Sequence, residues 1–148
     1  FLKQLSREDS EKWSGNVCWP ACISTITWDL PDTVLHELIQ ADWWDEKKWW
    51  KHSILLKYMI DRWYNSHKIL YRFFPTRILS LLKRKSDILL MASIDISQWS
   101  HLVIVKNGAN EQLDIFDPWT LFDTWWKKIW THTEFMKKWR KYGIIITL

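Results

Sequence analysis

The sequence predicts an α+β domain in which helices come first and a mostly antiparallel sheet follows. Apolar residues recur at helical spacing in the first part of the chain, up to about residue 63. Beyond that point the pattern changes to short apolar runs that are typical of strands. Between two of these runs stands Asn107-Gly108, a dipeptide that strongly favours a tight hairpin turn.

Three helices are predicted in the first part of the chain. The first begins at Cys18 or Pro20, since proline is tolerated in a first helical turn, and ends at about Thr27. Its buried stripe would carry Ala21, Cys22, Thr25 and Ile26. The second and third helices cover residues 32–41 and 52–63, each with apolar residues along one face.

The second part of the chain predicts strands with two helices among them. The strands cover residues 68–73, 87–94, 101–105, 112–116 and 144–148. A tight turn at Asn107-Gly108 would join the third of these strands to the fourth. Helices are predicted over residues 76–85 and from the capping pattern Thr131-His132-Thr133-Glu134 to Lys141.

Size and composition predict one soluble domain over residues 1–148, with an irregular lead-in over residues 1–12. The net charge is only +4 and the basic residues are scattered, so no nucleic-acid partner is expected. No apolar run approaches the roughly 20 residues of a membrane span, and no signal peptide is visible. Because the chain opens with Phe1 rather than Met, we expect an upstream piece outside this sequence.

Cysteine usage excludes two kinds of site. Two cysteines make no disulfide framework, and Cys18 and Cys22 are spaced by one helical turn, a poor geometry for a bridge. A zinc site needs further ligands, and no paired cysteine motif or close histidine pair supplies them. We therefore expect no metal and no organic cofactor.

Tryptophan is far too common and glycine far too rare. The chain has 14 Trp and 3 Gly among its 148 residues, whereas glycine averages about 7%. Several Trp stand where turns are expected, including Trp28 and Trp63. Our hypothesis is that many of them are glycines encoded by UGA, which some bacterial lineages read as glycine. The alternative is a truly Trp-rich binder of carbohydrate or membrane surfaces, and the codons decide between the two.

Three residues could form a nucleophilic site. Cys18 opens the first helix, where the helix dipole and unpaired N–H groups favour a thiolate. His101 opens a predicted strand, and Asp117 ends the strand paired with it. The hairpin would bring both strand ends to one edge of the sheet, where Asp117 could orient the imidazole.

Each of these residues also has a structural interpretation. A helical cysteine is often a small core residue, which is how we interpret Cys22. A strand histidine is often structural, and Asp117-Pro118 is a common turn pair. The joint occurrence of all three, in this order and on these elements, favours the Cys18–His101–Asp117 triad.

The same residues resemble the motifs of a known family. The segment from Cys18 to Cys22 is similar to the Cys-Gly-Pro-Ala-Cys signature of C39-like cysteine peptidases, a branch of the papain-like fold. His101 stands in a strand like that of the family's catalytic histidine, and Asp117-Pro118 matches its Asp-Pro element. Thr133-Glu134-Phe135 begins a segment like the family's closing helix, which carries Trp where this chain has Trp139. The resemblance spans roughly residues 13–148.

The resemblance implies a papain-like thiol hydrolase that cuts peptides, with a leader peptide cleaved after small residues as one candidate substrate. It also implies association with an export transporter, so a cytoplasmic location or the cytoplasmic face of such a transporter is favoured over secretion. In relatives, Gly stands at the positions of Trp19, Trp28, Trp63 and one of Trp49 and Trp50. We therefore expect Trp139 to be genuine and most of the others to be misread glycines.

One departure from the family concerns the oxyanion hole. The family has a Gln six residues before the nucleophile, and here that position is Lys12. Asn16 is a weak substitute because its spacing differs. Loss of one oxyanion donor costs about 100- to 1000-fold in rate. A degenerate module that binds peptide without cutting it is therefore the main alternative, and an acyltransferase using the same triad cannot be separated from a hydrolase.

Overall fold

The computed structural model describes residues 2–6, 8, 18–40, 52–70, 75–96, 99–118 and 126–148. Its described helices are α2 (Cys18–Thr27), α3 (Pro31–Gln40), α4 (His52–Asp61), α5 (Pro75–Arg84) and α6 (His132–Lys138). Its described strands are β1 (Asn65–Leu70), β2 (Ile88–Ile96), β3 (Trp99–Asn107), β4 (Gln112–Asp117), β5 (Trp126–Thr131) and β6 (Trp139–Thr147). The predicted α+β class is confirmed.

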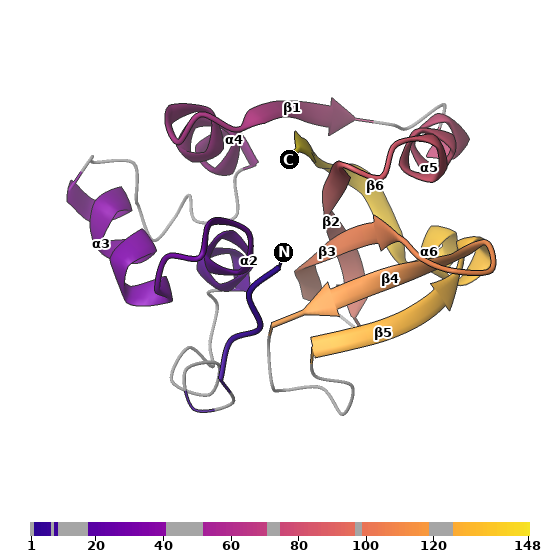
Figure 1. Ribbon diagram of the computed structural model, residues 1–148, viewed down its shortest axis with the longest axis horizontal. Helices are drawn as coiled ribbons and strands as arrows, with labels where there is room; N and C mark the ends of the chain where they lie inside the picture. Colours follow the sequence, from indigo (N-terminus) through magenta and orange to yellow (C-terminus); the bar gives the residue numbers. More distant parts are fainter. Residues whose placement is uncertain are drawn as a thin grey trace.

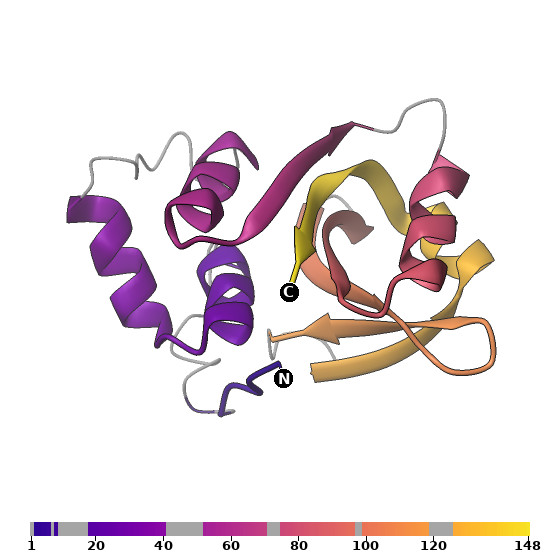
Figure 2. The same cartoon turned by 45° about the horizontal axis from the view of Figure 1, so that its top comes forward.

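The strands form one antiparallel sheet with the order β1-β6-β2-β3-β4-β5. Figure 1 shows α2, α3 and α4 grouped together on one side, while α5 and α6 lie on the other side of the sheet. The rotated view in Figure 2 shows the same separation. Helices α2 and α4 therefore pack against the sheet, and α3 packs on α2.

The core is divided by the sheet into two apolar clusters. Strand β2 shows why, because its side chains alternate between the two: Leu89 and Met91 pack with α2 and α4, whereas Leu90 and Ala92 pack with α5 and α6. Both faces of β2 are buried, which explains its nearly continuous apolar sequence. Ile23 from α2 is a fully buried member of the first cluster.

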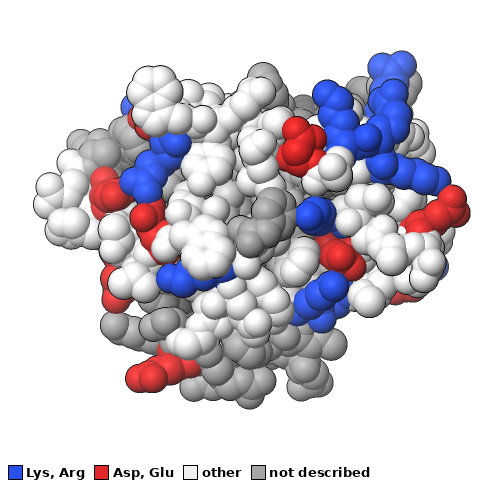
Figure 3. All heavy atoms as spheres, in the orientation of Figure 1, with Lys and Arg blue, Asp and Glu red and all other residues white. Residues whose placement is uncertain are grey.

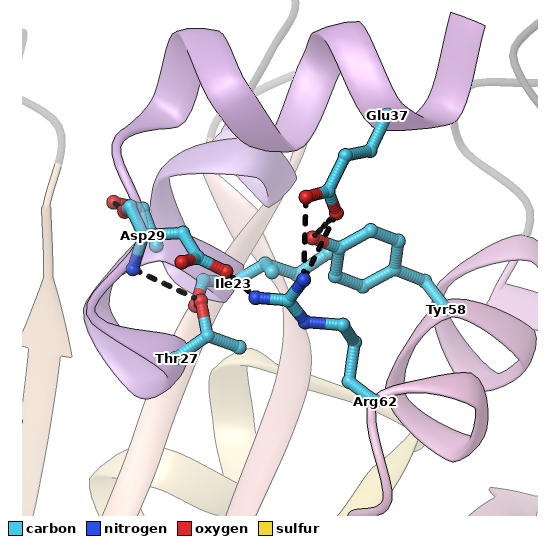
Figure 4. A network of polar contacts seen from close by, with 7 residues as sticks. Ile23, Thr27, Asp29, Glu37, Tyr58 and Arg62 are labelled. Carbon is cyan, nitrogen blue, oxygen red and sulfur yellow. Dashed lines mark hydrogen bonds and ion pairs between the residues drawn. The ribbon is translucent and has the colours of Figure 1, made fainter. Parts of the chain in front are cut away.

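A polar network holds the three helices of the first layer together (Figure 4). The Tyr58 hydroxyl on α4 donates to Oε2 of Glu37 on α3 at 2.8 Å. The Arg62 guanidinium lies 3.2 Å from both carboxylate oxygens of Glu37 and also forms an ion pair with Asp29, in the turn between α2 and α3. Burial and the neighbouring Glu37 carboxylate raise the pKa of Tyr58 well above its usual value. Arg62, directly after α4, thereby connects the end of α4 both to α3 and to the turn between α2 and α3.

The turn between β3 and β4 differs from the predicted one. A two-residue turn at Asn107-Gly108 would need left-handed backbone at both positions. Instead the loop covers residues 108–111, and the left-handed residues are Asn110 and Glu111, with φ of 54° and 59°. The Gly108 N–H donates to the carbonyl oxygen of Gln112 at 2.9 Å and closes this loop. The hairpin itself is present, so the two strand ends still meet.

Two further features of the last third of the chain differ from the sequence prediction. Residues 126–131 form β5, where no strand was predicted. The final helix ends at Lys138 rather than Lys141, because Trp139 already pairs with Ile94 on β2. Sheet hydrogen bonding thus replaces the last predicted turn of helix. The predicted cap is confirmed, since Thr131 Oγ1 accepts from the Glu134 N–H at 3.1 Å.

The tryptophans fall into two structural groups. Trp28, Trp63 and Trp126 have φ of 68°, 68° and 80°, a region that non-glycine residues rarely adopt. Trp63 is 96% exposed, and the Trp63 and Tyr64 N–H groups bond back to Ile60 and Met59, as in the helix ending that favours glycine at this position. In contrast, Trp139 is buried and stacks on Phe135 with ring centroids 5.2 Å apart. The backbone therefore favours glycine at the first group and a genuine Trp at position 139.

The surface carries both signs of charge. On the face drawn in Figure 3, Lys and Arg side chains lie among Asp and Glu side chains, and one group of basic side chains lies at the end of the molecule that carries α5. The last turn of α5 supplies Lys83 and Arg84, and Lys83 forms an ion pair with Glu111 at 2.8 Å. None of the helices in the described part of the chain combines the length and the apolar character needed to cross a membrane.

Candidate active site

Cys18 is the first residue of α2. The helix begins where the sequence predicts, so the backbone of Cys18 lies at the N-terminal end, where the helix dipole favours an anion. The Cys18 side chain lies outside the described part of the structure, as do Lys12 and Asn16. The proposed oxyanion donor at Asn16 therefore stays a prediction.

Cys22 lies one turn further along α2 and is fully buried in the first apolar cluster. Its thiol donates to the carbonyl oxygen of Leu102 on β3 at 3.3 Å. This agrees with the interpretation of Cys22 as a core residue. The contact also joins the helix that begins at Cys18 to the residue next to His101.

The structure brings His101 and Asp117 together. Nε2 of His101 lies 2.8 Å from Oδ1 of Asp117, and the two residues are 2% and 0% exposed. His101 lies near the start of β3 and Asp117 is the last residue of β4. The hairpin register, with Ile104 opposite Phe116, carries both to the same edge of the sheet.

The contact fixes how this histidine is protonated. A carboxylate only accepts hydrogen bonds, so the nitrogen that faces Asp117 must carry the hydrogen. Nε2–H of His101 therefore donates to Oδ1 of Asp117. In the neutral imidazole the other nitrogen, Nδ1, is then the basic one. A buried histidine held in one tautomer by a carboxylate is the arrangement of a general base.

Lys128 is a site residue that the sequence did not reveal. Its Nζ atom lies 3.7 Å from Oδ2 of Asp117, and its side chain is only 12% exposed. In the sequence, Lys127 and Lys128 resemble a solvated charge pair. In a strand only one of these two side chains points toward the interior. The surrounding tryptophans obscure the alternation of apolar and polar residues that would predict a strand here.

The described residues hold no group of three or more His, Cys, Asp or Glu side chains that could bind a metal ion. They do form an open pocket of about 440 Å³ between α5 and α6, which Ser80, Lys83 and His132 help to line. His101 and Asp117 are not among its lining residues. This pocket therefore lies apart from the candidate site, which is the edge of the sheet that carries the His101–Asp117 pair, beside α2.

Comparisons with known proteins address the fold. No protein-family model matches the chain, and no curated protein sequence matches it. One similar solved structure is a double-glycine-motif protease from an AMS/PCAT transporter, in complex with the leader peptide. It is 12% identical to this chain with a TM-score of 0.66, and the match covers 100% of this chain and 93% of that one. The peptidase domain of Streptococcus ComA, a bifunctional ABC transporter involved in quorum sensing, is 15% identical with a TM-score of 0.65 over 88% of this chain and 90% of that one.

A second ComA structure, the Streptococcus mutans peptidase domain with a small-molecule inhibitor, is 14% identical with a TM-score of 0.51. That match covers 69% of this chain and 78% of that one. The family resemblance in the sequence is thus matched by the three-dimensional arrangement of its elements. The chain has the α+β fold of transporter peptidase domains, the fold of the C39-like peptidases.

Proposed function

We propose that residues 1–148 form one C39-like peptidase domain, a thiol hydrolase that cleaves peptide bonds with Cys18, His101 and Asp117. The observation that carries the proposal is the buried His101–Asp117 pair at 2.8 Å, beside the helix that begins at Cys18. Support comes also from the Cys22–Leu102 contact, which attaches α2 to the strand carrying His101. A carboxylate that orients the imidazole is the arrangement found in catalytic triads.

In the proposed reaction, Nδ1 of His101 takes the proton of the Cys18 thiol. The thiolate attacks the carbonyl carbon of the scissile peptide, a C–S bond forms, and the negative charge moves to the carbonyl oxygen. The backbone N–H of Cys18, at the start of α2, is one donor to that oxygen. Asp117 keeps the imidazolium oriented while it forms.

The second half of the reaction restores the enzyme. His101 gives its proton to the leaving amine as the C–N bond breaks, which leaves a thioester on Cys18. A water molecule then loses a proton to His101 and attacks the thioester, which releases the carboxylic acid and the thiol. If an amine replaced water in this step, the same residues would transfer the acyl group instead.

The fold neighbours support a proposal about the substrate class. One of them is a double-glycine-motif protease in complex with its leader peptide, and the others are peptidase domains of a transporter. We propose that this chain acts on a leader peptide, cuts after small residues and works in association with an export transporter. The proposal adds no metal or organic cofactor.

The test is turnover of synthetic peptides that carry Gly-Gly before a short cargo, followed by mass spectrometry. We expect cleavage after Gly-Gly by the parent, loss of cleavage with Cys18→Ala and with His101→Ala, and no cleavage when Phe-Phe replaces Gly-Gly. Cleavage that persists in Cys18→Ala would rule out this nucleophile.

A degenerate peptide-binding module is the second candidate, and Lys12 at the position of the family's oxyanion Gln favours it. Loss of that donor alone leaves a slowed enzyme rather than an inert one. The two functions are separated by Lys12→Gln. A slowed enzyme gains turnover with this substitution, whereas a binding module binds the peptide with and without it and cuts in neither case.

A further inference from the structure

A lysine from the neighbouring strand approaches the carboxylate of Asp117 from its other side. Oδ1 of Asp117 lies 2.8 Å from Nε2 of His101, and Oδ2 lies 3.7 Å from Nζ of Lys128. The Asp117 side chain is fully buried and that of Lys128 is 12% exposed. The Asp117 carboxylate thus lies between the imidazole of His101 and the ammonium group of Lys128.

The sheet register explains why Lys128 reaches this position. In the β4–β5 pair, Ile115 lies opposite Lys128 and Asp117 lies opposite Trp126. Lys128 and Asp117 are therefore diagonal neighbours, a spacing that long side chains can bridge on one face of a sheet. Nζ of Lys128 also lies 5.6 Å from the ring centroid of Trp130, a cation–π distance that holds the ammonium against this face.

The proposed reaction gives this lysine a task that His101 cannot perform. The charge of His101 changes in each half-reaction, since the imidazole gains and loses a proton. The carboxylate of Asp117 accepts from Nε2–H of His101 in both half-reactions. A fully buried carboxylate is costly when no positive charge lies near it. While His101 is neutral, it supplies no positive charge to this carboxylate.

We propose that Lys128 is a positioning residue of the active site, a permanent counter-ion of the Asp117 carboxylate whose charge does not change when His101 gains or loses a proton. The inference rests on the proposed function, since it requires His101 to act as the base. Lys128 acts through Asp117 and does not touch the substrate. Its effect is on the rate of the chemical step rather than on peptide binding.

The chain supplies a matched control on the same strand. Nζ of Lys127 lies 3.6 Å from Oδ2 of Asp114, which is also a diagonal pair, along the other diagonal and on the opposite face of the β4–β5 pair. This second pair is open to solvent, since the Lys127 and Asp114 side chains are 47% and 20% exposed. An exposed pair of this kind contributes little. Lys127 and Lys128 thus differ in burial and in the aspartate they face, but not in type or strand.

The experiment compares kcat and KM of Lys128→Met, Lys128→Arg and Lys127→Met on the Gly-Gly peptide, with thermal denaturation of each variant. We expect Lys128→Met to lower kcat at least tenfold with KM within twofold, and Lys128→Arg to restore kcat to within about threefold. Lys127→Met should stay within twofold of the parent. In an Asp117→Asn background, Lys128→Met should change kcat less than twofold, because the charge that it compensates is gone.

The outcomes separate the two proposals. If the parent cuts the peptide but Lys128→Met keeps its kcat within twofold, the inference about Lys128 is wrong and the proposed function stands. If Lys128→Arg does not restore kcat, or if the loss is equally large in the Asp117→Asn background, Lys128 acts by shape rather than by charge and the inference is also overturned. If the parent does not cut or react through Cys18, both proposals fail together.

Discussion

The thiol of Cys22 donates a hydrogen bond to the carbonyl oxygen of Leu102 at 3.3 Å, which joins the helix that begins at Cys18 to the strand that carries His101. Both residues are buried, so the contact is protected from water. Together with the apolar packing between α2 and β3, it holds α2 against the strand that carries His101. Cys18 and His101, the first two residues of the proposed triad, are thus connected through the contact between Cys22 and Leu102.

This contact predicts how Cys22→Ala behaves. Loss of the buried sulfur and its hydrogen bond should lower the free energy of unfolding by about 1–2 kcal/mol, as measured by urea denaturation. Alkylation of the folded protein by iodoacetamide should persist, because Cys22 is buried and Cys18 is the proposed nucleophile. If alkylation disappears in Cys22→Ala and persists in Cys18→Ala, the nucleophile has been assigned to the wrong cysteine.

The helix ending at Trp63 predicts a stabilising substitution. Trp63 has φ of 68° and is 96% exposed, so its Cβ atom carries the strain of left-handed backbone while its ring adds little packing. Relief of left-handed strain is worth about 1–2 kcal/mol. Trp63→Gly should therefore raise the free energy of unfolding by about 1 kcal/mol, measured by urea denaturation.

Trp139→Gly is the matched control and should have the opposite sign. Trp139 is buried against Phe135, and removal of a buried aromatic ring costs about 3–5 kcal/mol. Equal losses at positions 63 and 139 would contradict the division of the tryptophans into two groups. The codons give an independent check, since UGG at position 63 would exclude a misread glycine there.

Tyr58 predicts a loss of stability at high pH. Burial, followed by the hydrogen bond to Glu37, raises the pKa of Tyr58 in the folded state above its unfolded value of about 10. The folded protein therefore holds this proton more tightly than the unfolded chain. The associated stability is present below pH 10 and is lost as the pH rises above it. The free energy of unfolding should fall more steeply between pH 9 and 11 in the parent than in Tyr58→Phe; equal slopes would contradict the assignment.

Asp117→Asn tests the orientation of the imidazole. The amide can present its NH₂ group to Nε2 and so favour the wrong tautomer of His101. We expect kcat on the Gly-Gly peptide to fall about a hundredfold or more, with a thermal midpoint close to that of the parent. A variant that keeps the parental kcat would show that Asp117 is a structural partner of His101 rather than part of the reaction.

Much of the fold could be predicted from the sequence because its signals are local. The apolar spacing of α2 to α5, the cap at Thr131 and the apolar run of β2 each depend on neighbouring residues. The pairing of His101 with Asp117 could also be anticipated, since one hairpin joins the two strands. The predicted turn type was wrong and the contact still forms, because both residues lie at the end of the hairpin away from the turn.

The features that the sequence did not reveal depend on contacts between distant segments. Strand β5 has no clear alternation of apolar and polar residues and is defined by its pairing with β4. Without that strand, Lys128 cannot be distinguished from Lys127, and the ion pair with Asp117 stays invisible. Trp139 belongs to β6 rather than to the helix because it pairs with Ile94 on β2, a contact that no local sequence pattern indicates.

The most direct test of the proposed triad is the rate of thiol alkylation by iodoacetamide near neutral pH, with the modified residue located by mass spectrometry. A thiolate activated by His101 should make Cys18 react at pH 6–7 at least tenfold faster in the parent than in His101→Ala, with no modification of folded Cys18→Ala. If Cys18 reacts at the same rate in the parent and in His101→Ala, the histidine does not activate it, and the account of this chain as a thiol hydrolase is wrong.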